Sequence, residues 1–240
     1  MAQSSTPRPL PSPDRSVTSI LNHAFQLYKG VVLQGALLLI MVSIVESLLL
    51  SFLGTPDFMS NVFDTGFPGT VEFNIGTGSS WRGKGSLGFL GVLLTPFWIG
   101  YLYLISRYNC NYSFDISDYF IGYKQNLVQI VLYGVISSVI LFVATLFLVV
   151  PVFFVMPLLM LGYPLLLFKN ASAVEALKTS VSIAKDNYSI FLGVCWLGGL
   201  MSLCGLIFFL IGIIFTIPFI IAVMFSTYCA YFGTPKPNLN

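Results

Sequence analysis

The sequence predicts an all-α integral membrane protein in which six transmembrane helices form three hairpins, each preceded by an amphipathic interfacial helix. Composition is the first reason: 56% of the 240 residues are hydrophobic and only 8% are charged, against about 25% charged residues in soluble domains. The second reason is that the chain contains uncharged stretches long enough to cross a bilayer. The third is a threefold recurrence of proline within apolar runs, at Pro96, Pro157 and Pro218.

The six spans follow from the positions of the charged residues. A bilayer core about 30 Å thick needs about 20 helical residues. Apolar runs over 31–53 and 85–106 supply one span each. The uncharged stretches 125–168 and 187–235 are each long enough for two helices, so we expect a tight hairpin in each, with turns near 150–151 and 210–212.

The orientation follows from the basic residues, because cytoplasmic loops carry an excess of Lys and Arg. With six spans, both termini lie on one side of the membrane. The opposite side holds only Arg82 and Lys84, and nine basic residues lie on the side of the termini: Arg8, Arg15, Lys29, Arg107, Lys124, Lys169, Lys178, Lys185 and Lys236. Both termini are therefore predicted to be cytoplasmic.

The prolines belong to a longer repeat. The intervals 96 to 157 and 157 to 218 are both 61 residues, and so is the interval from Lys124 to Lys185. Together with Lys29, these lysines divide the membrane domain 16–233 into three units, about 16–110, 111–171 and 172–233. "FQLYK" (25–29) and "FIGYK" (120–124) share the pattern Phe-x-x-Tyr-Lys. Each proline is expected to kink the second span of its hairpin, although unrelated prolines tolerated in lipid-embedded helices would give the same spacing by chance.

Each unit begins with a segment expected to lie on the cytoplasmic membrane surface. In the third unit, Ser172 and Glu175 form a capping box, and an apolar stripe runs through Val174, Leu177, Val181, Ala184 and Tyr188. Asp115 is the expected N-cap in the second unit and Ser16 in the first. Lys29, Lys124 and Lys185 lie near the ends of these segments and are predicted to contact lipid headgroups.

Two tails and one loop flank or interrupt the membrane domain. Residues 1–15 are rich in Pro and Ser and are predicted to form a disordered cytoplasmic tail. Residues 234–240 form a short cytoplasmic tail. A glycine-rich insertion over about 54–84 is expected outside the cytoplasm, where it could cover the mouth of the bundle or bind a protein partner; the sequence leaves both alternatives open.

Few residues in the chain could carry chemistry. The sequence contains no catalytic or phosphate-binding motif, and His23 has no neighbouring ligands at metal-site spacing. His23 is expected on the polar face of the first surface helix, with a pH-sensitive or lipid contact as the alternative. The cysteines are expected to be free. No catalytic residue, metal, cofactor or nucleic-acid partner is predicted.

Glu46 is the one acid within a predicted span. An ionisable residue inside a membrane is a functional-site hypothesis by default, and Ser43 and Ser47 lie on the adjoining helix face. These three residues form the candidate intramembrane polar site. Glu46 could be a buried, hydrogen-bonded packing residue, or it could line a cavity that carries an ion or a proton.

The segment "NASAVEALKTSVSIAKDNYSIFLGV" (170–194), followed by "GIIFTIPFIIAVMFSTYCAYF" (212–232), resembles a broad group of bacterial integral membrane proteins of unknown function. They are related to the membrane domain that precedes some glycerophosphodiester phosphodiesterases. The resemblance rests on Glu175, Ala176, Leu177 and Ser180 and on Pro218. It implies a multi-pass fold in the bacterial inner membrane, but no phosphodiesterase activity, because the catalytic domain is absent from this chain.

Three functions remain as alternatives. The leading one is a membrane protein without catalytic chemistry that acts as a scaffold, an accessory subunit or an envelope- or lipid-associated factor. The second is a small-molecule, ion or lipid transporter or channel that uses Glu46. A membrane enzyme is the third. Membrane lipids are expected partners in every case.

Overall fold

The computed structural model of the chain describes residues 10–52, 86–113, 115–146, 149–205 and 209–235, so the predicted loop 54–84 lies outside the described residues. The described residues form helices and no strand, which confirms the all-α class. In chain order these are α1 (Val17–Phe52), α3 (Ser86–Asn109), the 3-10 helix η1 (Ile116–Phe120), α4 (Ile121–Lys124), α5 (Leu127–Leu146), α6 (Val149–Leu159), α7 (Gly162–Phe168), α8 (Ala173–Asp186), α9 (Tyr188–Leu203), α10 (Phe209–Thr216) and α11 (Phe219–Phe232).

Four described segments are long and apolar enough to cross a bilayer: Val17–Leu49, Leu127–Leu146, Val150–Phe168 and Gly212–Phe232. They define a multi-pass membrane protein. The sequence predicts six spans, and α3 and α9 are not among these four. Helix α9 is apolar but only 16 residues long.

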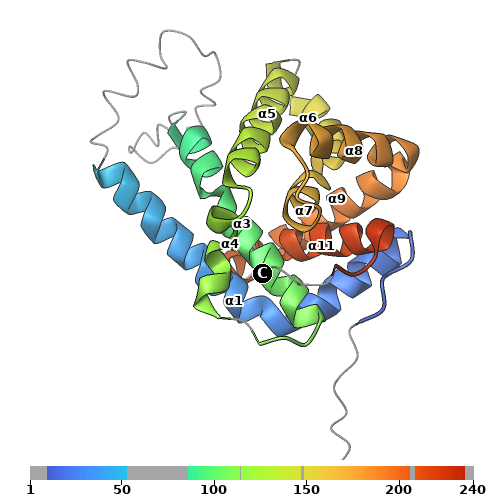
Figure 1. Cartoon of the computed structure of the whole chain (residues 1–240), viewed down its shortest axis with the longest axis horizontal. Helices are drawn as coiled ribbons and strands as arrows, with labels where there is room; N and C mark the ends of the chain where they lie inside the picture. Colours follow the sequence, from blue (N-terminus) through green and yellow to red (C-terminus); the bar gives the residue numbers. More distant parts are fainter. Residues whose placement is uncertain (1–9, 53–85, 114, 147–148, 206–208, 236–240) are drawn as a thin grey trace, which may run out of the picture.

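Helix α1 differs from the prediction for the first unit. The expected surface helix and the expected span 31–53 form one continuous helix of 36 residues. At 1.5 Å per residue, that is about 54 Å, well beyond the roughly 30 Å of a bilayer core. Figure 1 shows its N-terminal part beside α11 and its C-terminal part extending away from the other helices.

The surface segment of the second unit is shorter than predicted. Asp115 is the N-cap, as the sequence predicts, and forms a capping box with Asp118. However, the segment is a five-residue 3-10 helix followed by the four residues of α4, instead of a single amphipathic α-helix. It packs against α3.

Helix α8 begins after Ser172, whose side chain accepts a hydrogen bond from the backbone N–H of Glu175. This confirms the predicted start. The predicted stripe is expected at the membrane surface, and the face that α8 buries against neighbouring helices shares only Ala184 with it. Small residues form the buried face: Ala173, Ala176, Ser180 and Ala184. Val174 is 49% exposed. The reason is that small side chains let helix backbones approach closely in membrane proteins, so the larger apolar residues are left beside the contact.

The helices pack in a closed circuit. Within the described residues, α1 contacts α3, α3 contacts η1, α4 and α5, α6 contacts α5, α8 and α9, and α11 contacts α9 and returns to α1. Figure 1 shows α1 below and to the left, α5 and α6 above, and α8 and α9 to the right. Large side chains fill the core between them, among which Tyr101, Tyr133, Phe191 and Phe225 are fully buried.

Two glycines allow close backbone contact where α3 meets the second unit. A Cβ atom on Gly100 would collide with the backbone of Tyr119, and one on Gly122 would collide with the backbone of Pro96. Any larger residue at either position would push η1 and α4 away from α3. This contact holds the start of the second unit directly against the Pro96 turn of the first.

The three prolines interrupt their helices to different extents. Pro96 lies inside the continuous helix α3, and Pro157 lies near the end of α6, two residues before the break that separates it from α7. Pro218 is the N-cap of α11 and follows the end of α10. Proline has no N–H to donate and its ring crowds the preceding turn, which accounts for the breaks. The turns predicted near 150–151 and 210–212 do not occur there, because these residues lie within α6 and α10.

The predicted tail 1–15 is described from Leu10 onward, and there it contacts the end of the chain. The Ser12 and Thr234 hydroxyls are 3.2 Å apart and share a hydrogen bond. The Arg15 guanidinium lies 4.9 Å from the centre of the Tyr231 ring. The described part of this tail therefore packs on the C-terminal end of α11.

Candidate functional site

Three tyrosines at the starts of the units bond to the proline turns. Tyr28 Oη donates to the carbonyl of Phe215 at 2.7 Å, and Tyr123 Oη donates to the carbonyl of Leu93 at 2.9 Å. Tyr188 Oη donates to the carbonyl of Phe154 at 3.1 Å. Each accepting carbonyl lies three residues before a proline, namely Pro218, Pro96 and Pro157 in the same order.

These bonds have a common physical reason. A proline has no N–H for the carbonyl four residues before it, and its ring crowds the preceding turn. Carbonyls of that turn, here those three residues before each proline, then bond to donors on neighbouring helices, as the interior of a membrane requires. The Tyr28 ring also packs edge-on against Phe219, with ring centres 5.4 Å apart, and the Tyr123 ring packs in the same way against Phe97 at 4.9 Å. In both pairs the phenylalanine directly follows the proline. We call the three tyrosine–carbonyl bonds the tyrosine interlocks.

The interlocks connect the units in a cycle. Tyr123 of the second unit bonds to the first unit, Tyr188 of the third bonds to the second, and Tyr28 of the first bonds to the third. The sequence pattern Phe-x-x-Tyr-Lys contains Tyr28 and Tyr123, but the pattern alone does not indicate that their hydroxyls bond to another unit. Tyr188 lies four residues after the position that corresponds to them, Ala184, which is about one helical turn.

The predicted headgroup lysines Lys29, Lys124 and Lys185 are all exposed. The Lys29 ammonium lies 4.5 Å from the centre of the Phe25 ring on the same helix. Exposure leaves these side chains free to reach phosphate groups, and a headgroup contact stays a prediction.

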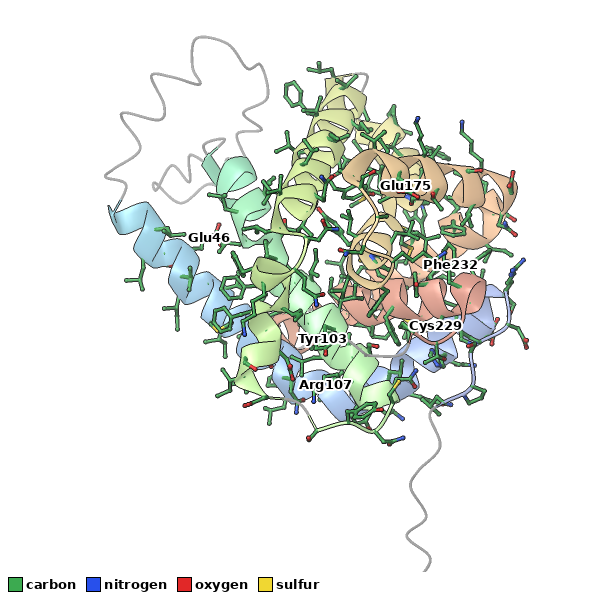
Figure 2. The ribbon with its side chains drawn as sticks, viewed as in Figure 1. Glu46, Tyr103, Arg107, Glu175, Cys229 and Phe232 are labelled. Atoms are coloured by element: carbon green, nitrogen blue, oxygen red, sulfur yellow. The ribbon has the colours of Figure 1, made fainter. Side chains whose placement is uncertain are left out.

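The structure brings only part of the predicted polar site together. Ser43 and Ser47 are exposed on α1 and line a shallow groove with Ile214 of α10. The Ser47 hydroxyl donates to the backbone carbonyl of Ser43 at 2.8 Å. Glu46 is half-buried and does not line this groove. Figure 2 shows Glu46 on the side of α1 that faces α3.

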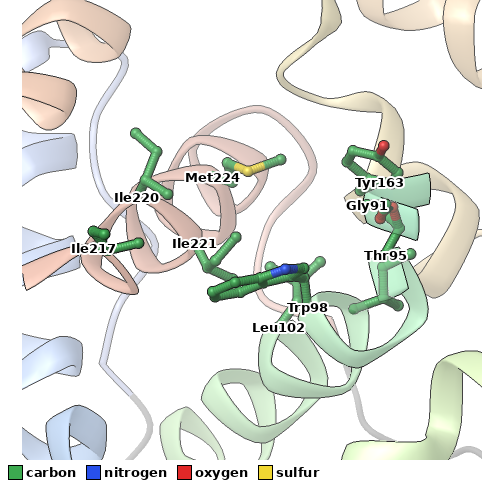
Figure 3. A pocket seen from close by; sticks show the side chains of 10 residues that line it. Gly91, Thr95, Trp98, Leu102, Tyr163, Ile217, Ile220, Ile221 and Met224 are labelled. Carbon is green, nitrogen blue, oxygen red and sulfur yellow. Dashed lines mark hydrogen bonds between the residues drawn. The ribbon is translucent and has the colours of Figure 1, made fainter. Parts of the chain in front are cut away.

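A cleft of about 370 Å³ lies between α3, α7 and α11, within the roughly 300–1,000 Å³ range of ligand sites. Figure 3 shows Trp98 of α3 and Ile221 of α11 next to each other across it. Helix α7 contributes Tyr163. The ten lining residues are Gly91, Thr95, Trp98, Ile99, Leu102, Tyr163, Ile217, Ile220, Ile221 and Met224, none of which is ionisable near neutral pH.

Apart from the indole N–H of Trp98, the polar side chains of the cleft are Thr95 and Tyr163, which lie close together. The Tyr163 hydroxyl lies beside the hydroxyls of Thr95 and Ser137. Thr95 Oγ1 donates to the carbonyl of Gly91 at 3.0 Å, and Ser137 Oγ donates to the carbonyl of Gly134 at 3.0 Å. A second hollow of about 270 Å³ shares Tyr163, Ile220 and Met224 with the cleft. Nothing in the sequence marks the cleft, because its residues resemble those of any apolar span.

A salt bridge lies near the C-terminal end of α3, away from the cleft residues Gly91 and Thr95. Arg107 Nη1 bonds to both oxygens of Asp118, at 2.9 and 3.1 Å. Asp118 also accepts from the backbone N–H of Asp115 at 2.7 Å. This pair fixes η1 to the end of α3, as Figure 2 illustrates around Arg107. It is the only salt bridge among the described residues.

His23 is not on a polar surface, contrary to the sequence prediction. It is buried between α1 and α11, where its Nδ1 lies 2.9 Å from the Ser226 hydroxyl. The reason is that α1 packs along α11 over this stretch. Its Nε2 is buried and has no hydrogen-bond partner among the described residues. All four cysteines are free, and no group of three potential metal ligands occurs in the described ranges.

No protein-family model matches the chain, and neither a characterised protein nor a solved structure is significantly similar to it. The resemblance seen at residues 170–194 and 212–232 therefore stays a prediction. Fold and site define a multi-pass helical membrane protein with an apolar cleft between α3, α7 and α11.

Proposed function

We propose that the chain forms six transmembrane helices as three hairpins: α1 with α3, α5 with α6 and α7, and α9 with α10 and α11. In this arrangement α3 and α9 supply the two spans beyond the four that length and composition identify. The 24 residues of α3 exceed the length that a bilayer requires. The 16 residues of α9 cover about 24 Å, a mismatch that local thinning of the bilayer accommodates. The cyclic tyrosine interlocks support three equivalent units.

The proposed orientation places both termini in the cytoplasm of a bacterium and the segment 54–84 outside the inner membrane. Its support is the excess of basic residues on one side. The interlock residues agree with this scheme, since Tyr28 and Tyr123 directly precede lysines on the cytoplasmic side.

Single-cysteine variants test this orientation. The substitutions Ser12→Cys and Thr77→Cys are made separately in a cysteine-free background, and whole cells are treated with a membrane-impermeant maleimide. We expect the Thr77→Cys variant to be labelled and the Ser12→Cys variant to be labelled only after the cells are broken open. The reverse pattern would overturn the orientation.

The proposed function is that of a lipid-associated membrane scaffold or accessory subunit without a catalytic role. The observation that carries it is the set of interlocks, which tie the hairpins into one bundle through backbone carbonyls and so favour a rigid body. The exposed outer face is apolar, with side chains such as Leu33, Leu48, Val139 and Leu200 directed to the surroundings. Segment 54–84 is the proposed contact for a protein partner.

Purification in native nanodiscs tests this function. We expect the full chain to bring down defined lipids and a protein in constant ratio, and a variant without 54–84 to keep the lipids and lose the protein. A full chain that carries no protein above the level of an unrelated six-span control would contradict the scaffold role. Equal recovery of the protein with and without 54–84 would contradict the assigned contact.

Transport through Glu46 is the second candidate function. The observation that favours it is that Glu46 is half-buried in a membrane-spanning helix and forms no salt bridge with the described residues. If it carries an ion or a proton, Glu46→Gln in proteoliposomes abolishes the flux and leaves unfolding unchanged. Glu175→Gln is the matched control, because Glu175 is exposed on α8. This variant is expected to keep the flux. A flux that survives Glu46→Gln removes this candidate.

A further inference from the structure

We propose that the cleft between α3, α7 and α11 holds the acyl chain of a membrane lipid. The lining is apolar along most of its length, with Ile99, Leu102, Ile217 and Ile220 as its aliphatic walls. The inference rests on the proposed six-span arrangement, in which α3, α7 and α11 lie within the bilayer and hydrocarbon is the surrounding solvent. The apolar lining and the surrounding hydrocarbon therefore both favour an acyl chain as the occupant.

Water fits this space poorly. A buried water needs two to four polar partners, and cavities lined by aliphatic and aromatic side chains stay dry. The Thr95 hydroxyl already donates to the Gly91 carbonyl, and the other polar side-chain groups of the lining are the Tyr163 hydroxyl and the indole N–H of Trp98. Most of the cleft therefore offers no site for water. An empty cleft would forfeit the dispersion contacts of its lining, whereas an acyl chain from the bilayer restores them.

The cleft is also open to its surroundings. Gly91 is exposed, and Trp98, Ile217 and Met224 are half-buried. A Cβ atom on Gly91 would meet no described atom within 4 Å. A chain can therefore enter past Gly91 without displacing helix backbone.

Trp98 provides a direct probe. The variant Trp81→Phe/Trp196→Phe leaves Trp98 as the only tryptophan of the full chain. It is reconstituted in phosphatidylcholine vesicles, with or without bromine atoms on the acyl chains, and titrated with acrylamide as an aqueous quencher. We expect strong quenching by the brominated chains and little by acrylamide. Strong quenching by acrylamide with none by bromine would show a water-filled vestibule and overturn the proposal.

A variant with a filled cleft distinguishes quenching by an acyl chain inside the cleft from quenching by lipid that only surrounds the protein. In the Trp98-only background, Gly91→Leu places a side chain in the cleft, and we expect it to abolish most of the bromine quenching. Gly199→Leu on α9 is the matched control, because its Cβ also meets no described atom and it lies outside the cleft. Quenching that is equal in both variants would overturn the proposal. Since the first experiment needs neither variant, a folding defect of Gly91→Leu leaves the proposal testable.

Discussion

The hydroxyl of Tyr28 donates a hydrogen bond of 2.7 Å to the carbonyl of Phe215, across 187 positions of sequence. This bond joins the first helix of the described chain to the proline turn between α10 and α11. Two similar bonds join the other units, so the three turns depend on donors from elsewhere in the chain. These tyrosines therefore stabilise the contacts between the units as well as the turns themselves.

Tyr28→Phe removes this donor and keeps the ring contact with Phe219. Hydrogen bonds between membrane helices contribute about 0.6 kcal/mol on average and up to about 1.7, and an orphaned carbonyl adds to the loss. We expect the free energy of unfolding in detergent to fall by about 0.5–2 kcal/mol. Tyr112→Phe is the control, because Tyr112 is exposed and its hydroxyl forms no hydrogen bond within the described residues. An equal loss in both variants would contradict the interlock.

A double-mutant cycle tests whether tyrosine and proline act together. Pro218→Ala restores an N–H that can pair with the Ile214 carbonyl and removes the ring that crowds the preceding turn. The neighbouring Phe215 carbonyl is then expected to depend less on Tyr28. We expect a coupling energy of about 0.5 kcal/mol or more between Tyr28→Phe and Pro218→Ala. The crossed pair, Tyr28→Phe with Pro96→Ala, joins residues of different interlocks and is expected to be additive. Additivity in both cycles would show that the tyrosines do not compensate for the prolines.

The close backbone contact at Gly100 leads to a second prediction about the stability of the protein. A Cβ atom there would collide with the Tyr119 carbonyl, which is backbone and cannot rotate aside. We expect Gly100→Ala to destabilise the protein by about 1–3 kcal/mol. Gly199→Ala places its methyl group in open space and is expected to be neutral or stabilising by up to about 1 kcal/mol. Thermal unfolding of the two variants in the same detergent measures the difference, and equal midpoints would exclude the close contact.

Alkaline pH tests the position of Tyr119 in η1. Burial raises the pKa of Tyr119 from 10.0 to about 12, and its hydroxyl donates to the carbonyl of Gln34. Because the folded pKa is raised, the stabilisation is complete below pH 10 and is lost as pH rises through about 12. We expect the free energy of unfolding to fall less steeply between pH 10 and 12 in Tyr119→Phe than in the parent protein. Identical pH slopes would show that Tyr119 ionises equally in the folded and unfolded states.

Sequence patterns could predict the helices better than their contacts. The N-caps Asp115 and Ser172 were predicted because capping depends on residues only a few positions apart. The face that α8 buries within the protein was not, because the apolar stripe was predicted to face the membrane surface, and it shares only Ala184 with the buried face. In the structure Ala176 is buried and Val174 is exposed, since close helix packing favours small side chains.

The interlocks and the cleft lay beyond sequence reasoning for a different reason. Tyr188 is shifted by one helical turn from the place where the repeat would put a tyrosine, and only coordinates show that it reaches Phe154. The cleft depends on how Trp98, Tyr163 and Ile221 from three separate helices come together, and each is an ordinary residue of an apolar stretch. Glu46 stood out in the sequence because of its charge, but its role stays a prediction.

The bond between Ser12 and Thr234 brings two distant parts of the backbone within reach of each other. Fragments of a split fluorescent reporter fused through short linkers next to these positions would be held side by side by the folded chain. Reporter complementation would then register correct assembly in living cells without purification. A new connection between these two positions, with the chain opened elsewhere, would also need only a short peptide.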